Sequence, residues 1–317
     1  MLNYNFMNKI ILFVIGLITS MTVFAQEKKY TTQDVEVNSL LKGTLYSPLS
    51  STSKTKLVIL IAGSGPTNRS GNQVGMINNS LKYLAEGLAE NGIAVYSYDK
   101  RIFAQMLNKT IDEKSLRFDD FINDAKEVVN HFKAEKKYSK IIIAGHSEGS
   151  LIGMVAANGL ADGFVSLAGA GRTIDKVIVE QLVKQAPNVK EEAEKDFELL
   201  KEGKSIESQN PMLSSIFRPS VQPYFTSWLK FDPQTEIKKL KIPTLIVNGT
   251  KDIQVPPSDA ELLHAANQKS KLLIIENMNH IFKEIKIDED NMKSYSNPDL
   301  PVIPELIAAL TNFIKTI

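Results

Sequence analysis

The chain has 317 residues and contains no cysteine. This absence excludes disulfide bonds, thiolate metal sites, a cysteine nucleophile and a lipid anchor attached through cysteine. The formal net charge is only +1, which gives no electrostatic basis for binding nucleic acid or an anionic membrane surface. Internal repeats and long low-complexity segments are also absent from the sequence. We therefore expect a globular protein that is stabilised by packing alone.

The first 25 residues have the pattern of a signal peptide. Lys9 precedes a short apolar run over residues 10–18, and Val23 and Ala25 precede a polar stretch. A basic start, a short apolar segment and small residues before the cleavage site are typical of secretory signals. We expect cleavage near Ala25, an exported (periplasmic or secreted) protein, and no stable membrane span afterwards. An uncleaved N-terminal anchor is the alternative, although the run is shorter than the about 20 residues that a span needs.

The rest of the chain alternates between apolar runs and helical patterns. The runs at residues 57–61 and 141–144 lack polar alternation, which is typical of strands covered on both faces. Residues 35–46 alternate loosely and indicate one antiparallel edge strand. Further expected strands lie at residues 93–98, 163–168, 242–247 and 271–275, and expected helices at 80–90, 118–136, 150–158, 258–267 and 304–314. Strands alternating with helices predict a mostly parallel α/β sheet flanked by helices.

Residues 172–239 break this alternation. They contain charged amphipathic segments without strand runs, and residues 209–223 are irregular and contain proline. We interpret the block as a cap of two or three helices inserted into one core, which residues 26–171 and 240–317 form together.

Residues 141–150, IIIAGHSEGS, carry the strongest chemical signal. A Gly-x-Ser-x-Gly motif between a buried strand and a helix is a nucleophile elbow, in which a sharp turn lifts Ser147 clear of the sheet. Gly145 and Gly149 are needed because a side chain at either position would clash with the neighbouring strand or helix. A purely structural turn is the alternative.

Ser147 needs a general base, because a serine hydroxyl is protonated at neutral pH. In parallel α/β sheets, chemistry gathers at the carboxyl ends of the strands. Of the four histidines, only His280 lies in a loop after an expected strand, and of the aspartates between Ser147 and His280 only Asp252 directly follows one. We predict Ser147, Asp252 and His280 as a catalytic triad in which the carboxylate fixes the histidine tautomer. A surface histidine and a turn-forming aspartate are the structural alternatives.

An oxyanion hole should complete the site. One donor is expected to be the backbone N–H of Glu148 at the start of the elbow helix, and the second the N–H of Ser64 in a glycine-rich loop. A phosphate site in that loop is disfavoured, because it lacks a Walker lysine and G-x-G-x-x-G spacing. Asp99, Arg101, Arg69 and Glu148 are interpreted as salt bridges that brace the catalytic loops rather than as substrate ligands, and Asp259 as an acid that compensates a helix dipole.

Four segments together resemble the α/β-hydrolase superfamily, and most closely its bacterial serine esterase branch, which is serine aminopeptidase-like or dienelactone hydrolase-like. They are AGSGPTNR at residues 62–69, YDKR at 98–101, GHSEG at 145–149 and MNH at 278–280. The resemblance implies the α/β-hydrolase fold and serine carboxylic-ester hydrolysis, with Ser147, Asp252 and His280 as triad and Ser64 and Glu148 as oxyanion donors. The sequence departs from the pattern at Asn68, where aspartate is usual, and at residues 102–103, where glycine is usual. Both departures lie near the predicted site mouth, so we expect them to affect pocket shape rather than the reaction.

The expected function is therefore hydrolysis of a small or medium ester through an acyl-enzyme, without a metal or organic cofactor. A lactone or macrolactone hydrolase, a thioesterase or an aminopeptidase-like amidase would use the same triad. For an amidase acting on free N-termini, the acidic cluster at residues 191–194 is a weak candidate amine site. A non-catalytic binding protein with this fold is the alternative from another class.

Overall fold

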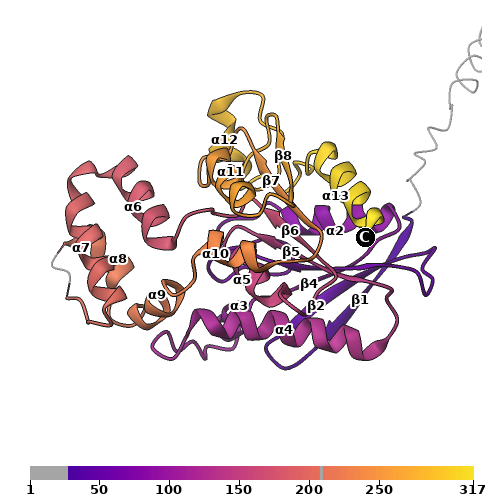
Figure 1. The fold of residues 1–317 in the computed structure, drawn as a ribbon, viewed down its shortest axis with the longest axis horizontal. Coiled ribbons are helices and arrows are strands. Elements are labelled where there is room, and N and C mark those ends of the chain that lie inside the picture. Colours follow the sequence, from indigo (N-terminus) through magenta and orange to yellow (C-terminus); the bar gives the residue numbers. More distant parts are fainter. Residues whose placement is uncertain (1–27, 208–209) are drawn as a thin grey trace, which may run out of the picture.

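The computed structural model describes residues 28–207 and 210–317, so the expected signal peptide lies outside the described residues. An eight-stranded sheet forms the centre of the molecule (Figure 1), with strand order β1-β2-β4-β3-β5-β6-β7-β8. β1 and β2 pair antiparallel with each other, β2 pairs antiparallel with β4, and the remaining neighbours are parallel. The strands are β1 (Tyr30–Glu36), β2 (Lys42–Pro48), β3 (Leu57–Ile61), β4 (Ala94–Tyr98), β5 (Ile141–His146), β6 (Gly163–Leu167), β7 (Thr244–Gly249) and β8 (Lys271–Ile275).

Helices cover both faces of this sheet. Side chains alternate between the two faces of a strand, so Ile59 and Ile61 of β3 enter one hydrophobic cluster and Val58 and Leu60 enter the other. Helices α4, α5 and α11 pack against the first cluster, and α2 and α13 against the second. These helices are α2 (Ser80–Glu90), α4 (Phe118–Glu135), α5 (Glu148–Ala157), α11 (Pro257–Ala266) and α13 (Pro304–Thr316); short helices α3 (Arg101–Leu107), η3 (Asp288–Asp290) and α12 (Asn291–Ser294) lie in connections.

The segment between β6 and β7 is entirely helical where it is regular. It extends away from the edge of the sheet (Figure 1) and has its own hydrophobic cluster, which includes Phe197, Leu213 and Phe217. We call this segment, residues 172–239, the cap. Its described helices are α6 (Ile174–Gln185), η2 (Pro187–Val189), α7 (Lys190–Lys201), α8 (Pro211–Phe217), α9 (Gln222–Trp228) and α10 (Pro233–Lys239).

The cap therefore contains more helix than its sequence suggested. Residues 209–223 were expected to be irregular and contain proline, yet α8 begins at Pro211 and α9 has Pro223 in its first turn. Proline is well tolerated at the first positions of a helix, where its missing N–H has no intrahelical partner. The side chain of Asn210 accepts a hydrogen bond from Met212 N and caps α8.

One further expectation was wrong, and one helix was not anticipated. Residues 35–46 form no single strand: they join β1 to β2 through a tight turn, in which Asn38 Oδ1 accepts the N–H groups of Leu40 and Leu41. The turn after β4 continues directly into α3, which no apolar periodicity indicated. In the described ranges, no helix is both long and apolar enough to cross a membrane.

Candidate active site

Ser147 lies at the sharp turn between β5 and α5, and its backbone is strained. Its φ and ψ angles are 54° and −120°, a region that residues with a side chain rarely adopt and that costs about 1–3 kcal/mol. The turn is held because Ser147 N donates to Leu167 O of β6 at 2.9 Å. A Cβ at Gly145 would lie 2.0 Å from Gly149 O, and one at Gly149 would lie 2.5 Å from Ile61 O. The GHSEG pattern is thus required by close backbone approach, as the sequence indicated.

Asp252 and His280 meet at the same edge of the sheet. Asp252 follows β7 and His280 follows β8, and His280 Nδ1 lies 2.8 Å from Asp252 Oδ2, with both residues buried. The other oxygen of Asp252 accepts the N–H groups of Gln254 and Val255 at 2.8 and 2.9 Å. A carboxylate accepts and cannot donate, so His280 Nδ1 carries the proton and Nε2 is left as the basic nitrogen.

His146 supports His280 from behind. No role for His146 was expected from the sequence, but its ring packs against the His280 ring with centroids 4.8 Å apart. His146 Nε2 lies 2.9 Å from His280 O, and a carbonyl accepts, so Nε2 is the protonated nitrogen. Burial and the neighbouring His280 lower the pKa of His146 to about 3. The ring is therefore neutral at pH 7 and acts as a packing and hydrogen-bonding support.

The two expected oxyanion donors lie beside the serine. Glu148 is the first residue of α5, and the loop of Ser64 follows β3, the neighbour of β5 in the sheet. A Cβ at Gly63 would come within 3.2 Å of Ser147 Cβ, so glycine lets this loop approach the elbow. Neither Ser64 N nor Glu148 N donates to a protein acceptor within the described ranges. Both N–H groups are thus available for a developing oxyanion.

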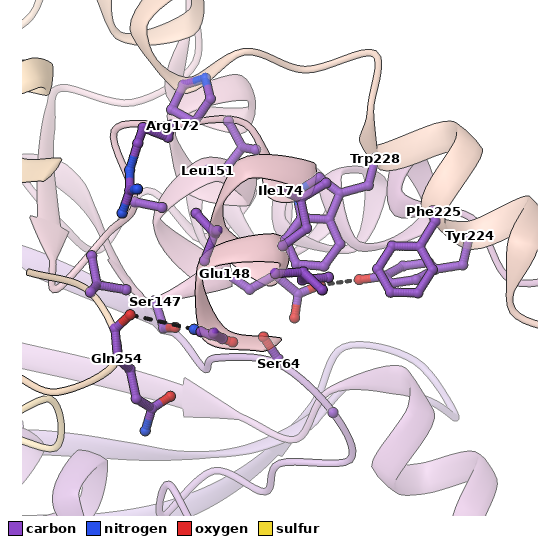
Figure 2. A pocket seen from close by; sticks show the side chains of 17 residues that line it. Ser64, Ser147, Glu148, Leu151, Arg172, Ile174, Tyr224, Phe225, Trp228 and Gln254 are labelled. Atoms are coloured by element: carbon purple, nitrogen blue, oxygen red, sulfur yellow. Dashed lines mark hydrogen bonds between the residues drawn. The ribbon is translucent and has the colours of Figure 1, made fainter. Parts of the chain in front are cut away.

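A buried ion pair connects these loops, and sequence reasoning missed one of its members. Lys100 Nζ lies 2.9 Å from Glu148 Oε2 and 2.8 Å from Gly63 O. The other oxygen of Glu148 accepts a short hydrogen bond from the hydroxyl of Tyr224 on α9 (Figure 2). Of the residues interpreted as bracing salt bridges, Arg69 pairs with Asp99 and Arg101 with Asp124. Lys100 lies two residues after the end of β4, and this position at the carboxyl end of a strand was the signal that could have identified it as a residue near the site.

An apolar cavity of about 400 Å³ lies between Ser147 and the cap. Figure 2 shows Ser147, Ser64 and Glu148 on one side of it and Ile174, Phe225 and Trp228 from the cap on the other. Arg172 also lines it, but its guanidinium binds Asp259 and Glu180. Asp259 therefore forms an ion pair with Arg172 in addition to lying in the first turn of α11. The cavity is lined by Ser64, Gly65, Ser147, Glu148, Leu151, Ala170, Arg172, Ile174, Val177, Ile178, Gln181, Tyr224, Phe225, Trp228, Pro233, Gln254 and Val255.

A second cavity, of about 320 Å³, lies on the other side of Ser147 and contains His280. It is more polar, because the side chains of Gln73, Asn78, Gln254 and Tyr295 contribute to its wall. Ser147, Ser64, Gly65 and Gln254 line both cavities. Ser147 thus lies at the junction of two cavities, and His280 lines the more polar of the two.

The residues at the two departures from the esterase pattern do not line either cavity. Asn68 Oδ1 accepts the N–H groups of Ser70 and Asn72, an acceptor role that aspartate would fill equally well. Ile102 and Phe103 belong to α3, and neither they nor Asn68 are among the residues that line the cavities. None of these three residues therefore contributes to the wall of either cavity, and an effect on pocket shape stays a prediction. Among the residues that the structure describes, no group of three or more His, Asp or Glu side chains could hold a metal ion.

Comparisons with known proteins agree with this architecture. Residues 75–218 match the family described as serine aminopeptidase, S33 (Hydrolase_4). The chain is 28% identical over 273 residues to "Esterase EstD" of Thermotoga maritima; the alignment covers 81% of this chain and 61% of that protein, so the chain spans less than two thirds of its relative. Among solved structures, Est1E from Butyrivibrio proteoclasticus has a TM-score of 0.57 at 18% identity, covering 90% of this chain and 98% of that one. A dienelactone hydrolase from Anabaena variabilis has a TM-score of 0.51 at 17% identity, covering 91% and 98%.

Proposed function

We propose that this chain, an α/β-hydrolase by its fold and family match, is a serine carboxylic-ester hydrolase that works through an acyl-enzyme. The observation that carries the proposal is the position of Ser147: a strained serine at the junction of two cavities, one of which contains a histidine already oriented by a buried aspartate. The similarity to an esterase supports the same activity.

In the proposed reaction, Ser147 Oγ attacks the ester carbonyl carbon while His280 Nε2 takes the hydroxyl proton. The carbonyl oxygen becomes an oxyanion and accepts hydrogen bonds from Ser64 N and Glu148 N. The intermediate collapses, the C–O bond to the alcohol breaks, and His280 returns the proton to the leaving oxygen. Water then attacks the acyl-enzyme with His280 again as base, which releases the carboxylic acid and restores Ser147. Asp252 stabilises the imidazolium in both halves.

The two cavities support a proposal for where the acyl group and the alcohol of the ester bind. His280 must protonate the leaving oxygen, so the alcohol belongs on the side of His280, in the smaller and more polar of the two cavities. The acyl group then occupies the apolar cavity under the cap. Because Arg172 is already paired with two carboxylates, the described residues that line this cavity offer no free cation to an anionic acyl group. We therefore propose an uncharged, apolar acyl group of small or medium size, with the leaving alcohol on the side of His280.

The same geometry weighs against an aminopeptidase. An enzyme that binds a free amine needs an unpaired carboxylate near the serine, and among the described residues lining either cavity Glu148 is the one acidic side chain. Its oxygens already accept from Lys100 and Tyr224. Residues 191–194 lie on α7 and are not among the lining residues. Thioesters and lactones, including macrolactones, fit the same chemistry and should be assayed beside simple esters.

We also propose that the protein is exported and processed near Ala25, since residues 1–25 carry the signal-peptide pattern. Expression in a bacterial host followed by fractionation and N-terminal sequencing tests this. The proposal expects an exported chain that begins at Gln26. A full-length chain retained with the membrane fraction would favour the uncleaved anchor.

Hydrolysis of p-nitrophenyl esters from acetyl to palmitoyl, with an aminoacyl anilide and a macrolactone alongside, tests the proposed activity. Ser147→Ala should lower kcat for p-nitrophenyl butyrate by about 10⁴-fold or more while the protein stays folded. Ser139→Ala is the matched control, because Ser139 Oγ only binds Lys54 O and Thr55 O near the opposite ends of the strands. Full activity in Ser147→Ala, or a wild type that hydrolyses none of these substrates, would refute the proposal.

A further inference from the structure

The proposed reaction assigns no role to the buried ammonium group of Lys100. Lys100 is 3% exposed and lies at the start of α3, outside the triad. Its three neighbours are Glu148 Oε2 at 2.9 Å, Gly63 O at 2.8 Å and the Phe121 ring, whose centroid is 4.5 Å away. Burying a charge is costly unless it is paired and hydrogen-bonded. The contact to Gly63 O is one of the hydrogen bonds that offset this cost.

Gly63 O and Ser64 N belong to the same peptide group. In a trans peptide the C=O and N–H bonds point in opposite directions. When Lys100 holds the carbonyl from one side, the N–H of Ser64 is turned to the other, and this peptide lies against the elbow, as the 3.2 Å approach of a Gly63 Cβ to Ser147 Cβ shows. A cation on the carbonyl also polarises the amide, which strengthens its N–H as a donor.

The same ammonium also contacts the side chain of Glu148, the residue that carries the second donor. Glu148 supplies its backbone N–H to the oxyanion site, and its side chain ends on Lys100 Nζ. Tyr224 of the cap donates to the other carboxylate oxygen. Burial and the nearby Glu148 raise the pKa of Tyr224 well above its usual range, so the hydroxyl keeps the proton that it donates. One buried cluster thus connects the Ser64 loop, the elbow and the wall of the acyl cavity.

The next peptide of the loop is held independently. Ser64 O accepts from Gln73 Nε2 at 2.7 Å and from Thr67 Oγ1 at 2.9 Å. Without Lys100 the loop would keep these two anchors and its fold, but the Gly63–Ser64 peptide would lose the bond that fixes its rotation. The contact to Lys100 therefore sets the direction of one N–H rather than the folding of the whole loop.

We infer that Lys100 is a positioning residue for the oxyanion hole, holding the Ser64 N–H and the Glu148 N–H toward one point through its bonds to Gly63 O and the Glu148 carboxylate. The inference rests on the proposed function, because it needs an oxyanion to be stabilised. It deepens that function by adding a group that acts in the transition state without touching substrate. Misdirecting one donor should cost less than removing it, which lowers kcat by about 10²–10³-fold in other serine hydrolases.

The test compares two variants, because Lys100→Met alone would leave Glu148 as an unpaired buried carboxylate. Glu148→Gln is the reference, and Lys100→Met/Glu148→Gln removes the ammonium from that background without leaving a buried charge. We expect the double variant to lose a further ~10- to 100-fold in kcat for p-nitrophenyl butyrate with KM changed less than about threefold. Its affinity for 1-butaneboronic acid, which forms a tetrahedral adduct with serine, should fall by a similar factor. Inhibition by the product butyrate should stay the same.

Lys140→Met is the matched control. Lys140 forms an ion pair with the partly exposed Asp162 at the amino end of β5, where Asp162 keeps its hydrogen bond from Ile141 N, and Lys140 contacts neither Gly63 nor Glu148. This variant should keep wild-type kinetic constants and boronate affinity. The inference is overturned if the double variant matches Glu148→Gln in kcat and boronate affinity, or if boronate and butyrate affinities fall equally, which would mark a general loss of structure. A wild type without esterase activity would instead overturn the proposed function itself.

Discussion

Replacing Asp252 with asparagine should inactivate the enzyme by reversing the tautomer of His280. Asp252 Oδ1 accepts the N–H groups of Gln254 and Val255, so an asparagine must place its carbonyl oxygen there. Its NH₂ group then takes the place of Asp252 Oδ2, which lies 2.8 Å from His280 Nδ1 in the wild type. An NH₂ group donates, which requires Nδ1 to accept and puts the ring proton on Nε2. The nitrogen that should take the proton of Ser147 is then already protonated.

The expected loss in kcat is ~10⁴-fold, as for the equivalent change in other serine triads, which corresponds to about 5.4 kcal/mol in the activation barrier. The assay is steady-state hydrolysis of p-nitrophenyl butyrate, with thermal unfolding to verify the fold. Asp162→Asn is the matched control: Asp162 also accepts a backbone N–H, from Ile141, and a lysine ammonium, but at the amino end of β5. A kcat for Asp252→Asn within tenfold of wild type would refute the assignment of Asp252.

Two more predictions concern the cavity and the stability of the fold. Val177 lines the apolar cavity, so Val177→Phe should lower kcat/KM for p-nitrophenyl octanoate at least ~10-fold and change the acetate value less than about threefold, because a larger side chain shortens the space for the acyl group; equal losses for both esters would contradict the acyl assignment. Burial lowers the pKa of Lys283 from its ordinary 10.5 to about 8. The unfolded chain therefore binds more protons than the folded one between about pH 8 and 10.5, and the contribution of this residue to stability rises with pH in that window. Wild type should gain stability over Lys283→Met between pH 7 and 10 in denaturant unfolding, and a constant difference would contradict this.

The parts of the site that follow strands could be predicted from the sequence. Apolar runs identify buried strands, and the carboxyl ends of parallel strands meet at one edge. His280 and Asp252 could therefore be selected by asking which residues directly follow β8 and β7, and the structure brings these two into contact. The elbow carried its own signal, since its two glycines are required by close backbone approach.

Contacts between distant segments were not predictable from one sequence. Lys100, Glu148 and Tyr224 come from three separate regions, and nothing in their spacing indicates that they meet. The support of His280 by His146 was missed because a residue in the elbow can point to either side of the turn. The cap was under-assigned because residues 209–223 were expected to be irregular, whereas α8 and α9 begin there with proline in the first turn.

The most direct test of the account is to locate the covalent intermediate. Wild-type protein is treated with a small alkyl fluorophosphonate, and the labelled site is found by peptide mass spectrometry. The account predicts one phosphonyl group per chain, on the Ser147 side chain, with no label in Ser147→Ala and slow labelling in Asp252→Asn. Labelling of a different serine, or a wild type that remains unlabelled while it hydrolyses esters, would contradict the claim that Ser147 is the nucleophile.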